Sequence, residues 1–312
     1  MRKNIVNREE IEGRLYDFDL TVKEVQNQAS TYFGKPFISG TVSIATDDEG
    51  LNVIDVHYTF ITEITANNKN DSRYPALKRI METGKTWVKD GKDMATKLKI
   101  NSAAALNDFY PQGGDELVSQ QRNESGFITF LSTLCPDGIN RHKFIFDAVI
   151  NRVDVREPEN APVYAQIRCA IFNFRKDILP FTLIARDPGA IDYFESLGVN
   201  EGEPVFTQVW GEIVNTTQKI EREIESAWGA PQVEYSERTA REWVVTGARP
   251  DPYGFGDETN ITEEEINAAL AKRNVDLEVI KTRAKQYYAE HGNAIQPAPA
   301  PTNAVPQGKF NF

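Results

Sequence analysis

The chain has 312 residues, 40% of them hydrophobic, which is enough for a sizeable core and for about two domains of ordinary size. Acidic side chains outnumber basic ones by 46 to 35, and the net charge of −11 argues against nucleic-acid binding over the whole surface, because affinity for phosphate comes from Lys and Arg. The two cysteines, Cys135 and Cys169, each lie in an apolar run, which argues against a disulfide scaffold and a Cys-ligated zinc site.

The first residues are charged and are not followed by the apolar stretch of a signal peptide or membrane span. We therefore expect a cytoplasmic protein without a membrane partner, in the host cell cytoplasm if the protein is viral. Between Lys69 and Lys99, basic residues outnumber acidic ones although the whole chain is acidic. This segment is either a local basic surface or an ordinary solvated helix and loop.

The first part of the chain predicts three strands, a helix and two further strands. Apolar and polar residues alternate in the strands, and in the third we expect Ile54, Val56, Tyr58 and Phe60 to point inward. The period then changes to about 3.6 residues, which predicts a helix that ends at Gly84. The expected strands are 11–22, 38–44, 53–64, 96–105 and 126–134, and the expected helix is 74–81.

The same order of elements recurs in the second part of the chain, which predicts a tandem repeat of one architecture. An additional helix is expected over Thr216 to Ala227, because Ile220 and Ile224 are four residues apart among charged side chains. The expected strands are 144–155, 163–174, 181–185, 205–215 and 243–247, and the expected short helix is 190–197.

The chain end differs in composition. A linker rich in Gly, Pro and Asp precedes Thr262-Glu263-Glu264-Glu265, a capping box that predicts the start of a helix. A Pro/Ala-rich spacer follows and cannot fold alone. The predicted organisation is a first barrel at 9–135, a second barrel at 141–249, a linker at 250–260, a C-terminal helix at 261–291 and a flexible tail at 292–312.

Five strands with a helix between the third and fourth is the order of the OB-fold, a small Greek-key barrel that commonly binds oligonucleotides. Glu12-Gly13-Arg14-Leu15 opens the first strand, and the run from Gly34 to Val42 forms the second. With these segments and its separate aromatic-ended tail, the chain resembles phage-type single-stranded DNA-binding proteins. It departs from the usual pattern of the bacterial family by having two candidate barrels and a tail tip that carries Lys309 in place of acidic residues.

The resemblance implies a mainly β protein of two tandem OB-like five-stranded barrels that binds single-stranded DNA in phage-type replication or recombination. Binding without sequence preference needs aromatic rings on which bases stack and cations that follow the phosphates. Tyr110 and Phe172 are further stacking candidates, and Arg152, Arg175, Lys176 and Arg186 are further phosphate candidates. The main predicted contacts are Arg14, Lys35, Phe37, Lys85, Trp87, Lys89, Lys92, Lys97, Lys99, Tyr164, Arg168 and Trp210. Trp87 is expected in an exposed hairpin or loop.

Phe310 and Phe312, at the end of the spacer, are predicted to dock a protein partner, such as another replication or recombination protein. The three histidines have no ligand at metal-binding spacing, and no phosphate-binding loop or nucleophile motif occurs, so we expect no enzyme, cofactor or metal. A nuclease built on carboxylates dispersed along the chain stays open. The alternative function is a non-enzymatic structural or protein-interaction protein, as in virion assembly.

Overall fold

The computed structural model describes residues 5–158, 162–224, 228, 232–255 and 261–291, and within these ranges it leaves undescribed the side chains of 139, 216–224, 232–240 and 291. The predicted tail contacts Phe310 and Phe312 lie outside the described residues. Among the described helices, none has the length and apolar character needed to cross a membrane.

The first barrel is a closed ring of five strands. Hydrogen-bonded pairing runs β1–β3–β4–β6–β5 and back to β1, and β4 and β6 are parallel while the other pairs are antiparallel. A short strand, β2, extends the sheet from β3. The elements are β1 (Asn7–Phe18), β2 (Thr21–Glu24), β3 (Pro36–Ala45), β4 (Val53–Thr62), α1 (Arg73–Thr83), α2 (Trp87–Asp90), β5 (Lys97–Phe109) and β6 (Val118–Phe130).

The second barrel repeats this connectivity. Its pairing runs β7–β8–β9–β11–β10 and back to β7, again with one parallel pair, β9 with β11. Its elements are η1 (Gly138–Arg141), β7 (His142–Arg156), β8 (Tyr164–Phe172), β9 (Ile178–Ala185), α3 (Pro188–Ser196), β10 (Val205–Ile224) and β11 (Gln232–Ala248). The prediction of a mainly β chain with two OB-like modules is confirmed.

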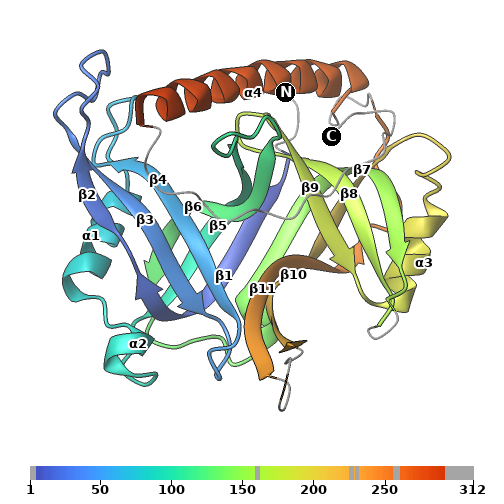
Figure 1. The fold of residues 1–312 in the computed structure, drawn as a ribbon, viewed down its shortest axis with the longest axis horizontal. Coiled ribbons are helices and arrows are strands. Elements are labelled where there is room, and N and C mark those ends of the chain that lie inside the picture. The colour runs from blue at the N-terminus through green and yellow to red at the C-terminus, as the bar shows by residue number, and fades with distance from the viewer. Residues whose placement is uncertain (1–4, 159–161, 225–227, 229–231, 256–260, 292–312) are drawn as a thin grey trace.

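The two barrels share one sheet and one core. Strands β1 and β7 pair antiparallel, which joins all eleven strands into a single sheet (Figure 1). A continuous hydrophobic cluster contains Ile11 and Ile100 of the first barrel together with Phe146 and Phe181 of the second. The barrels are therefore fixed to each other by backbone pairing and by packing.

The helix expected over Thr216 to Ala227 is wrong where the structure describes it. Strand β10 continues to Ile224 and pairs with β11 along this whole length. Residues four apart share a face in a strand as well as in a helix, so the spacing of Ile220 and Ile224 fits both. The backbone register pairs Ile220 with Ser236 and Ile224 with Gln232.

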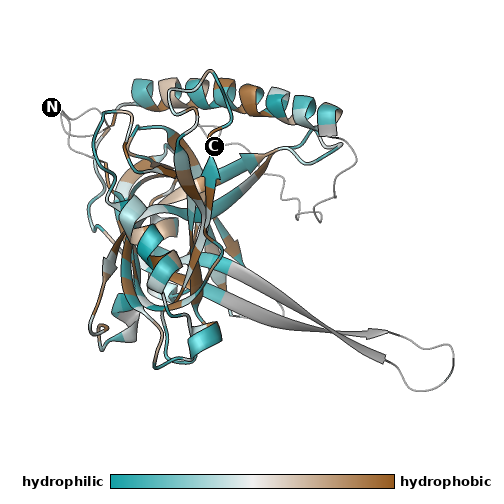
Figure 2. Ribbon diagram, turned by 90° about the vertical axis from the view of Figure 1, so that its left-hand side faces the viewer, coloured by the Kyte–Doolittle hydropathy of each residue, from teal (hydrophilic) through white to brown (hydrophobic). Residues whose placement is uncertain are grey.

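Helix α4 (Glu263–His291) lies along the top of the molecule and bridges the barrels (Figures 1 and 2). Thr262 and the N3 residue Glu265 exchange the two hydrogen bonds of a capping box, of 3.3 and 3.1 Å. Further along, Arg273 binds Asp108 of β5 with a 2.9 Å ion pair, and Lys272 binds Asp177 beside β9. These contacts attach α4 to both barrels.

Candidate nucleic-acid interface

An aromatic cluster covers the outer surface at one end of β3 and β4. The ring of Phe60 lies 4.7 Å from that of Phe37 and 5.6 Å from that of Tyr32, between centroids. Phe60 is 44% exposed and the neighbouring Phe33 is 50% exposed. Lys35 places its Nζ 5.6 Å from the centre of the Tyr32 ring. Rings on the second and third strands of the barrel are thus accompanied by a ring and a cation from the loop before β3, next to the surface that OB-folds use for oligonucleotides.

The prediction that Phe60 points inward is wrong because β4 contains one extra residue. Ile38 pairs with Ile61, and Gly40 pairs with Tyr58. One residue, Ser39, thus lies between the two pairs on β3, whereas two residues, Thr59 and Phe60, lie between them on β4. Such a bulge interrupts the alternation of faces. Tyr58 and Ile61 are both buried, and Phe60 between them points outward.

Polar side chains continue this surface along β3 and β4. His57 lies 3.1 Å from the hydroxyl of Thr41, measured from Nδ1, and is half-buried. Burial, assisted by the charge of Arg122 on β6, lowers the pKa of His57 below its ordinary value. At neutral pH the imidazole is therefore uncharged, and it serves as a hydrogen-bonding group.

Arginines from both barrels border the same surface. Arg241 of β11 donates from Nη2 to Asp55 of β4 over 2.8 Å, and Arg122 of β6 donates to Glu124 over 3.2 Å. Each guanidinium is thus paired with a carboxylate. The local excess of positive charge is accordingly small, and Lys35 is the most exposed cation of the group.

Side-chain hydrogen bonds hold the second barrel against this surface. Asn52, just before β4, donates to the carbonyl of Ile213 over 3.2 Å and accepts from the backbone of Asn215 over 2.8 Å. Gln121 of β6 donates to the carbonyl of Thr182 in β9 over 3.0 Å. The β3–β4 surface and the second barrel are therefore positioned relative to each other by direct contacts.

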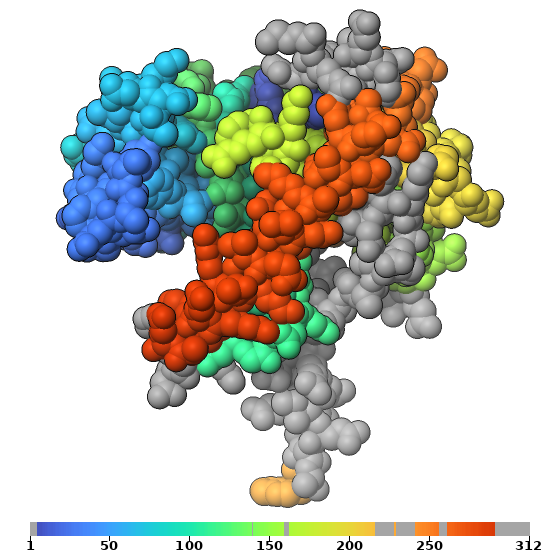
Figure 3. Space-filling view, turned by 90° about the horizontal axis from the view of Figure 1, so that it is seen from above, coloured from blue at the N-terminus to red at the C-terminus, as the bar shows by residue number. Residues whose placement is uncertain are grey.

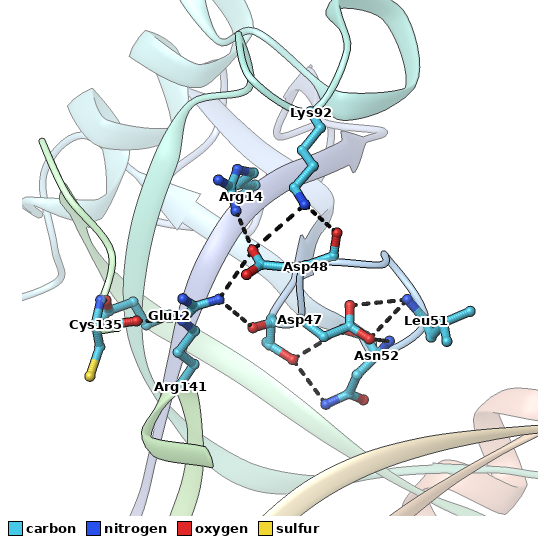
Figure 4. A network of polar contacts seen from close by, with 10 residues as sticks. Glu12, Arg14, Asp47, Asp48, Leu51, Asn52, Lys92, Cys135 and Arg141 are labelled. Atoms are coloured by element: carbon cyan, nitrogen blue, oxygen red, sulfur yellow. Dashed lines mark hydrogen bonds and ion pairs between the residues drawn. The ribbon is translucent and has the colours of Figure 1, made fainter. Parts of the chain in front are cut away.

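Two of the predicted cations, Arg14 and Lys92, meet at the turn between β3 and β4. Asp48 lies between them and Arg141, at 3.0 Å from Arg14, 3.9 Å from Lys92 and 3.6 Å from Arg141 (Figure 4). Burial pushes the pKa of Asp48 upward, but the hydrogen bond from Arg14 and the three positive charges outweigh it and lower this pKa. Arg14 and Lys92 are thus bound to a carboxylate of the chain itself.

Trp87 lies in the short helix α2, and the expected hairpin or loop is wrong. Its ring is half-buried, 6.2 Å from the ring of Tyr16, and Lys92 is 5.7 Å from it. Lys89 lies 5.7 Å from the ring of Phe18, and Lys85 is exposed. This group occupies a corner of the first barrel that is separate from the Phe37–Phe60 cluster.

The other predicted contacts of the first barrel are dispersed. Lys97 and Lys99 are on β5, which pairs with β1 and β6 and not with β3 or β4. Lys99 forms a 2.7 Å ion pair with Glu10, and Lys97 donates to the carbonyl of Ser132 over 3.1 Å. Tyr110 is 9% exposed, so its prediction as an exposed stacking residue is wrong.

In the second barrel, Tyr164 and Arg168 lie on β8, and Trp210 lies on β10, which is not adjacent to β8 in the ring. Arg168 binds Asp154 at 3.1 Å, and Asp154 also binds Arg152. The expectation that Phe172 is an exposed platform is wrong, because it belongs to a buried cluster. The predicted residues of this barrel therefore do not form one site.

The sequence interpretation missed Tyr32, Phe33, Phe60 and the two arginines from β6 and β11. The pair Tyr32-Phe33 beside Lys35 was a readable signal, since adjacent aromatics in a Gly-containing loop have no strand to bury them. Within the part of the chain that the structure describes, no cluster of three or more His, Cys, Asp and Glu side chains is arranged to hold a metal ion.

Comparison with known proteins places the chain in a family. No curated protein matches it. Among solved structures it is similar to the wild-type single-stranded DNA-binding protein from Thermus aquaticus, with a TM-score of 0.45 and 12% identity over 82% of this chain and 97% of that chain. A deletion mutant of the same protein gives a TM-score of 0.47 and 10% identity over 82% and 98%. The model of the YorF family matches residues 6–283, and the chain therefore belongs to the YorF family.

Proposed function

We propose that this protein binds single-stranded DNA on the outer surface of β3 and β4, without sequence preference and without catalysing a reaction. The observation that carries the proposal is the cluster of Tyr32, Phe37 and Phe60 with Lys35 beside it. Bases of a single strand are free to stack on such rings, whereas bases of a duplex are already stacked on each other.

Stacking supplies most of the affinity in this proposal. Phe60 is the most exposed ring of the cluster, at 44%, and Phe33, next to Tyr32 in the chain, is 50% exposed. A base on an aromatic platform contributes about 1–3 kcal/mol, whatever its identity, because every base has a π-face. The absence of sequence preference follows from this chemistry.

Contacts to the phosphates supply a smaller part of the affinity for single-stranded DNA. Lys35 is exposed, but Arg122 and Arg241 are already paired with Glu124 and Asp55. Each phosphate neutralised by a cation contributes about 0.7 to the slope of log affinity against log salt for a single strand. We therefore expect a shallow salt dependence, consistent with a chain whose net charge is −11.

A protein that covers single strands in this way serves processes that expose them, and we propose DNA replication or recombination as its setting. The competing proposal is a structural or protein-interaction role, in which the same rings contact protein. Fluorescence anisotropy of a labelled oligothymidine at two salt concentrations separates them. Binding with a shallow salt slope supports the first, and no binding at low salt overturns it.

A further inference from the structure

The two barrels carry corresponding turns, each between the second and third strand of its ring. In the first barrel, Asp47 shapes the turn between β3 and β4 by accepting the backbone N–H of Leu51 at 3.0 Å and of Asn52 at 2.9 Å. In the second barrel, Asn173 shapes the turn between β8 and β9 by accepting the N–H of Arg175 at 2.8 Å and of Asp177 at 3.0 Å. One polar side chain thus builds each turn from within.

The two turns display opposite charge. The β3–β4 turn carries Asp48 and Glu49, and Asp48 is held by Arg14 and Lys92 (Figure 4). The corresponding residues of the β8–β9 turn are Phe174, Arg175 and Lys176, all of them exposed. The β8–β9 turn therefore offers exposed positive charge to an anionic polymer, whereas the cations at the β3–β4 turn are already paired with Asp48.

Phe174 is the most informative residue of the second turn. It is 89% exposed, and the guanidinium carbon of Arg175 lies 5.2 Å from its ring centre. A single exposed apolar residue is ordinary on a protein surface. An aromatic ring accompanied by two consecutive cations is the combination that recognises a base together with its phosphates.

The turn is rigid enough to present this ring in a fixed place. Lys176 adopts a left-handed conformation with φ of 63° and donates its N–H to the carbonyl of Asn173 over 2.9 Å. Phe172 and Ile178 flank the turn and are buried in a cluster with Ile266 of α4. Ordering the turn on binding therefore costs little conformational entropy.

The acidic group nearest in sequence is already neutralised. Asp177 binds Lys272 of α4, and this hydrogen bond, which outweighs the effect of burial, lowers the pKa of Asp177. Asp276 is one turn further along α4 and binds the same lysine, 3.7 Å away. Lys272 thus offsets part of the negative charge beside the turn, and Arg175, which also interacts electrostatically with Asp177, and Lys176 are both exposed. Seen from above, the yellow-green segment around residue 175 is exposed beside α4 (Figure 3).

We propose that the β8–β9 turn is a second contact for the single strand, with Phe174 stacking on a base and Arg175 and Lys176 binding flanking phosphates. This inference rests on the proposed function and assigns the second barrel a part in it. A single DNA strand that is bound at the Phe37–Phe60 cluster then reaches the β8–β9 turn only if it has enough nucleotides. A short oligonucleotide contacts either the Phe37–Phe60 cluster or the β8–β9 turn, but not both.

The experiment titrates a short and a long labelled oligothymidine, by fluorescence anisotropy, with the wild type, Phe174→Ala, the double variant R175A/K176A, Phe60→Ala and Leu51→Ala. Leu51 is 74% exposed on the corresponding turn of the first barrel, so its variant is a matched control for loss of an exposed apolar side chain. We expect Phe174→Ala to weaken binding of the long oligothymidine by about 5-fold or more. R175A/K176A should lower its salt slope by about 1.4, and Leu51→Ala should change neither.

The outcomes distinguish this inference from the proposed function. If Phe174→Ala and R175A/K176A both bind the long oligothymidine as Leu51→Ala does, while Phe60→Ala is weakened, the second contact is refuted and the proposed site stands. If Phe174→Ala is weakened and Phe60→Ala is not, the turn is supported and the β3–β4 site is refuted. If the wild type binds neither oligothymidine, both proposals fall. Melting temperatures of all variants should equal that of the wild type, because the replaced side chains are exposed.

Discussion

The indole nitrogen of Trp243 donates a 2.9 Å hydrogen bond to a carboxylate oxygen of Glu9, and both side chains are buried. Ser102 donates to the other oxygen, also over 2.9 Å. Glu9 lies on β1 and Ser102 on β5, whereas Trp243 lies on β11. One carboxyl group thus links the two barrels through residues that are far apart in the sequence.

This link predicts that stability depends on pH near neutrality. Burial raises the pKa of Glu9 from 4.5 to about 7, against the opposing effect of its hydrogen bonds. In the unfolded chain the group ionises at its ordinary pKa, so it holds a proton in the fold over a range in which the unfolded chain has lost it. The stabilisation that this proton gives the fold is fully present below about pH 4.5 and declines as the pH rises towards 7. Above about pH 7 Glu9 is ionised in both states, and its effect on stability no longer changes with pH.

Replacing Glu9 by Gln should therefore make the protein more stable than the wild type at pH 8, by up to about 3 kcal/mol, and bring no such gain at pH 5. Gln still accepts from Trp243 and can donate to Ser102. Urea unfolding of both proteins from pH 5 to 8 measures the difference, with Glu49→Gln on the exposed turn as the control. Parallel pH profiles for Glu9→Gln and the wild type would contradict the assignment.

Closure of the first barrel predicts a severe effect at Gly13. A Cβ atom at this position would lie 2.1 Å from the backbone oxygen of Ala45, where β1 pairs with β3. Backbone cannot move away as a side-chain tip can, so Gly13→Ala should lower the free energy of unfolding by about 3 kcal/mol or more. Gly138→Ala is the control, because nothing lies within 4 Å of its Cβ position. Equal melting temperatures for the two variants would refute this account.

The attachment of α4 gives a third prediction. The side chains of Arg273 and Asp108 are only 12% and 11% exposed, so Arg273→Ala leaves a largely buried carboxylate without its cation. Such a loss costs about 3–5 kcal/mol, and the melting temperature should fall accordingly. Lys272, the residue before Arg273, is 57% exposed and pairs with Asp177. Lys272→Ala breaks this more exposed ion pair and should change the melting temperature little. A similar small change for both variants would show that α4 is not held by the buried pair.

The architecture was predictable because alternation and helical periodicity act locally. Each barrel strand that the pattern indicated lies between turns rich in Gly, Asp or Asn, and the capping box marked the start of α4. The hairpin of β10 and β11 was not predictable in the same way, since the spacing of Ile220 and Ile224 suits two structures. Ile220 pairs with Ser236, 16 positions further along the chain, so a local pattern does not contain its partner.

The candidate site was less predictable, because it depends on which strand neighbours which. Phe37 and Lys35 were identified from composition, but Arg241 reaches Asp55 from 186 residues away. Arg14 and Lys92 were identified as phosphate contacts, and only the folded structure reveals that Asp48 binds both. The alternation of the sequence predicted that Phe60 points inward. A one-residue bulge in β4 turns it outward, and the alternation gives no sign of this bulge.

The final prediction contrasts two aromatic residues that composition alone treats alike. Trp87 packs on Tyr16 and against Gly50, whose Cβ position lies 3.4 Å from the indole, so we expect Trp87→Ala to destabilise the fold by about 2 kcal/mol and to leave DNA affinity nearly unchanged. Phe60 is 44% exposed beside Phe37, so Phe60→Ala should keep the melting temperature and weaken oligothymidine binding by about 1–3 kcal/mol. Urea unfolding and anisotropy on both variants give four values. If Trp87→Ala loses affinity while Phe60→Ala loses only stability, the interface lies at the corner formed by α2, and the β3–β4 surface has a structural role.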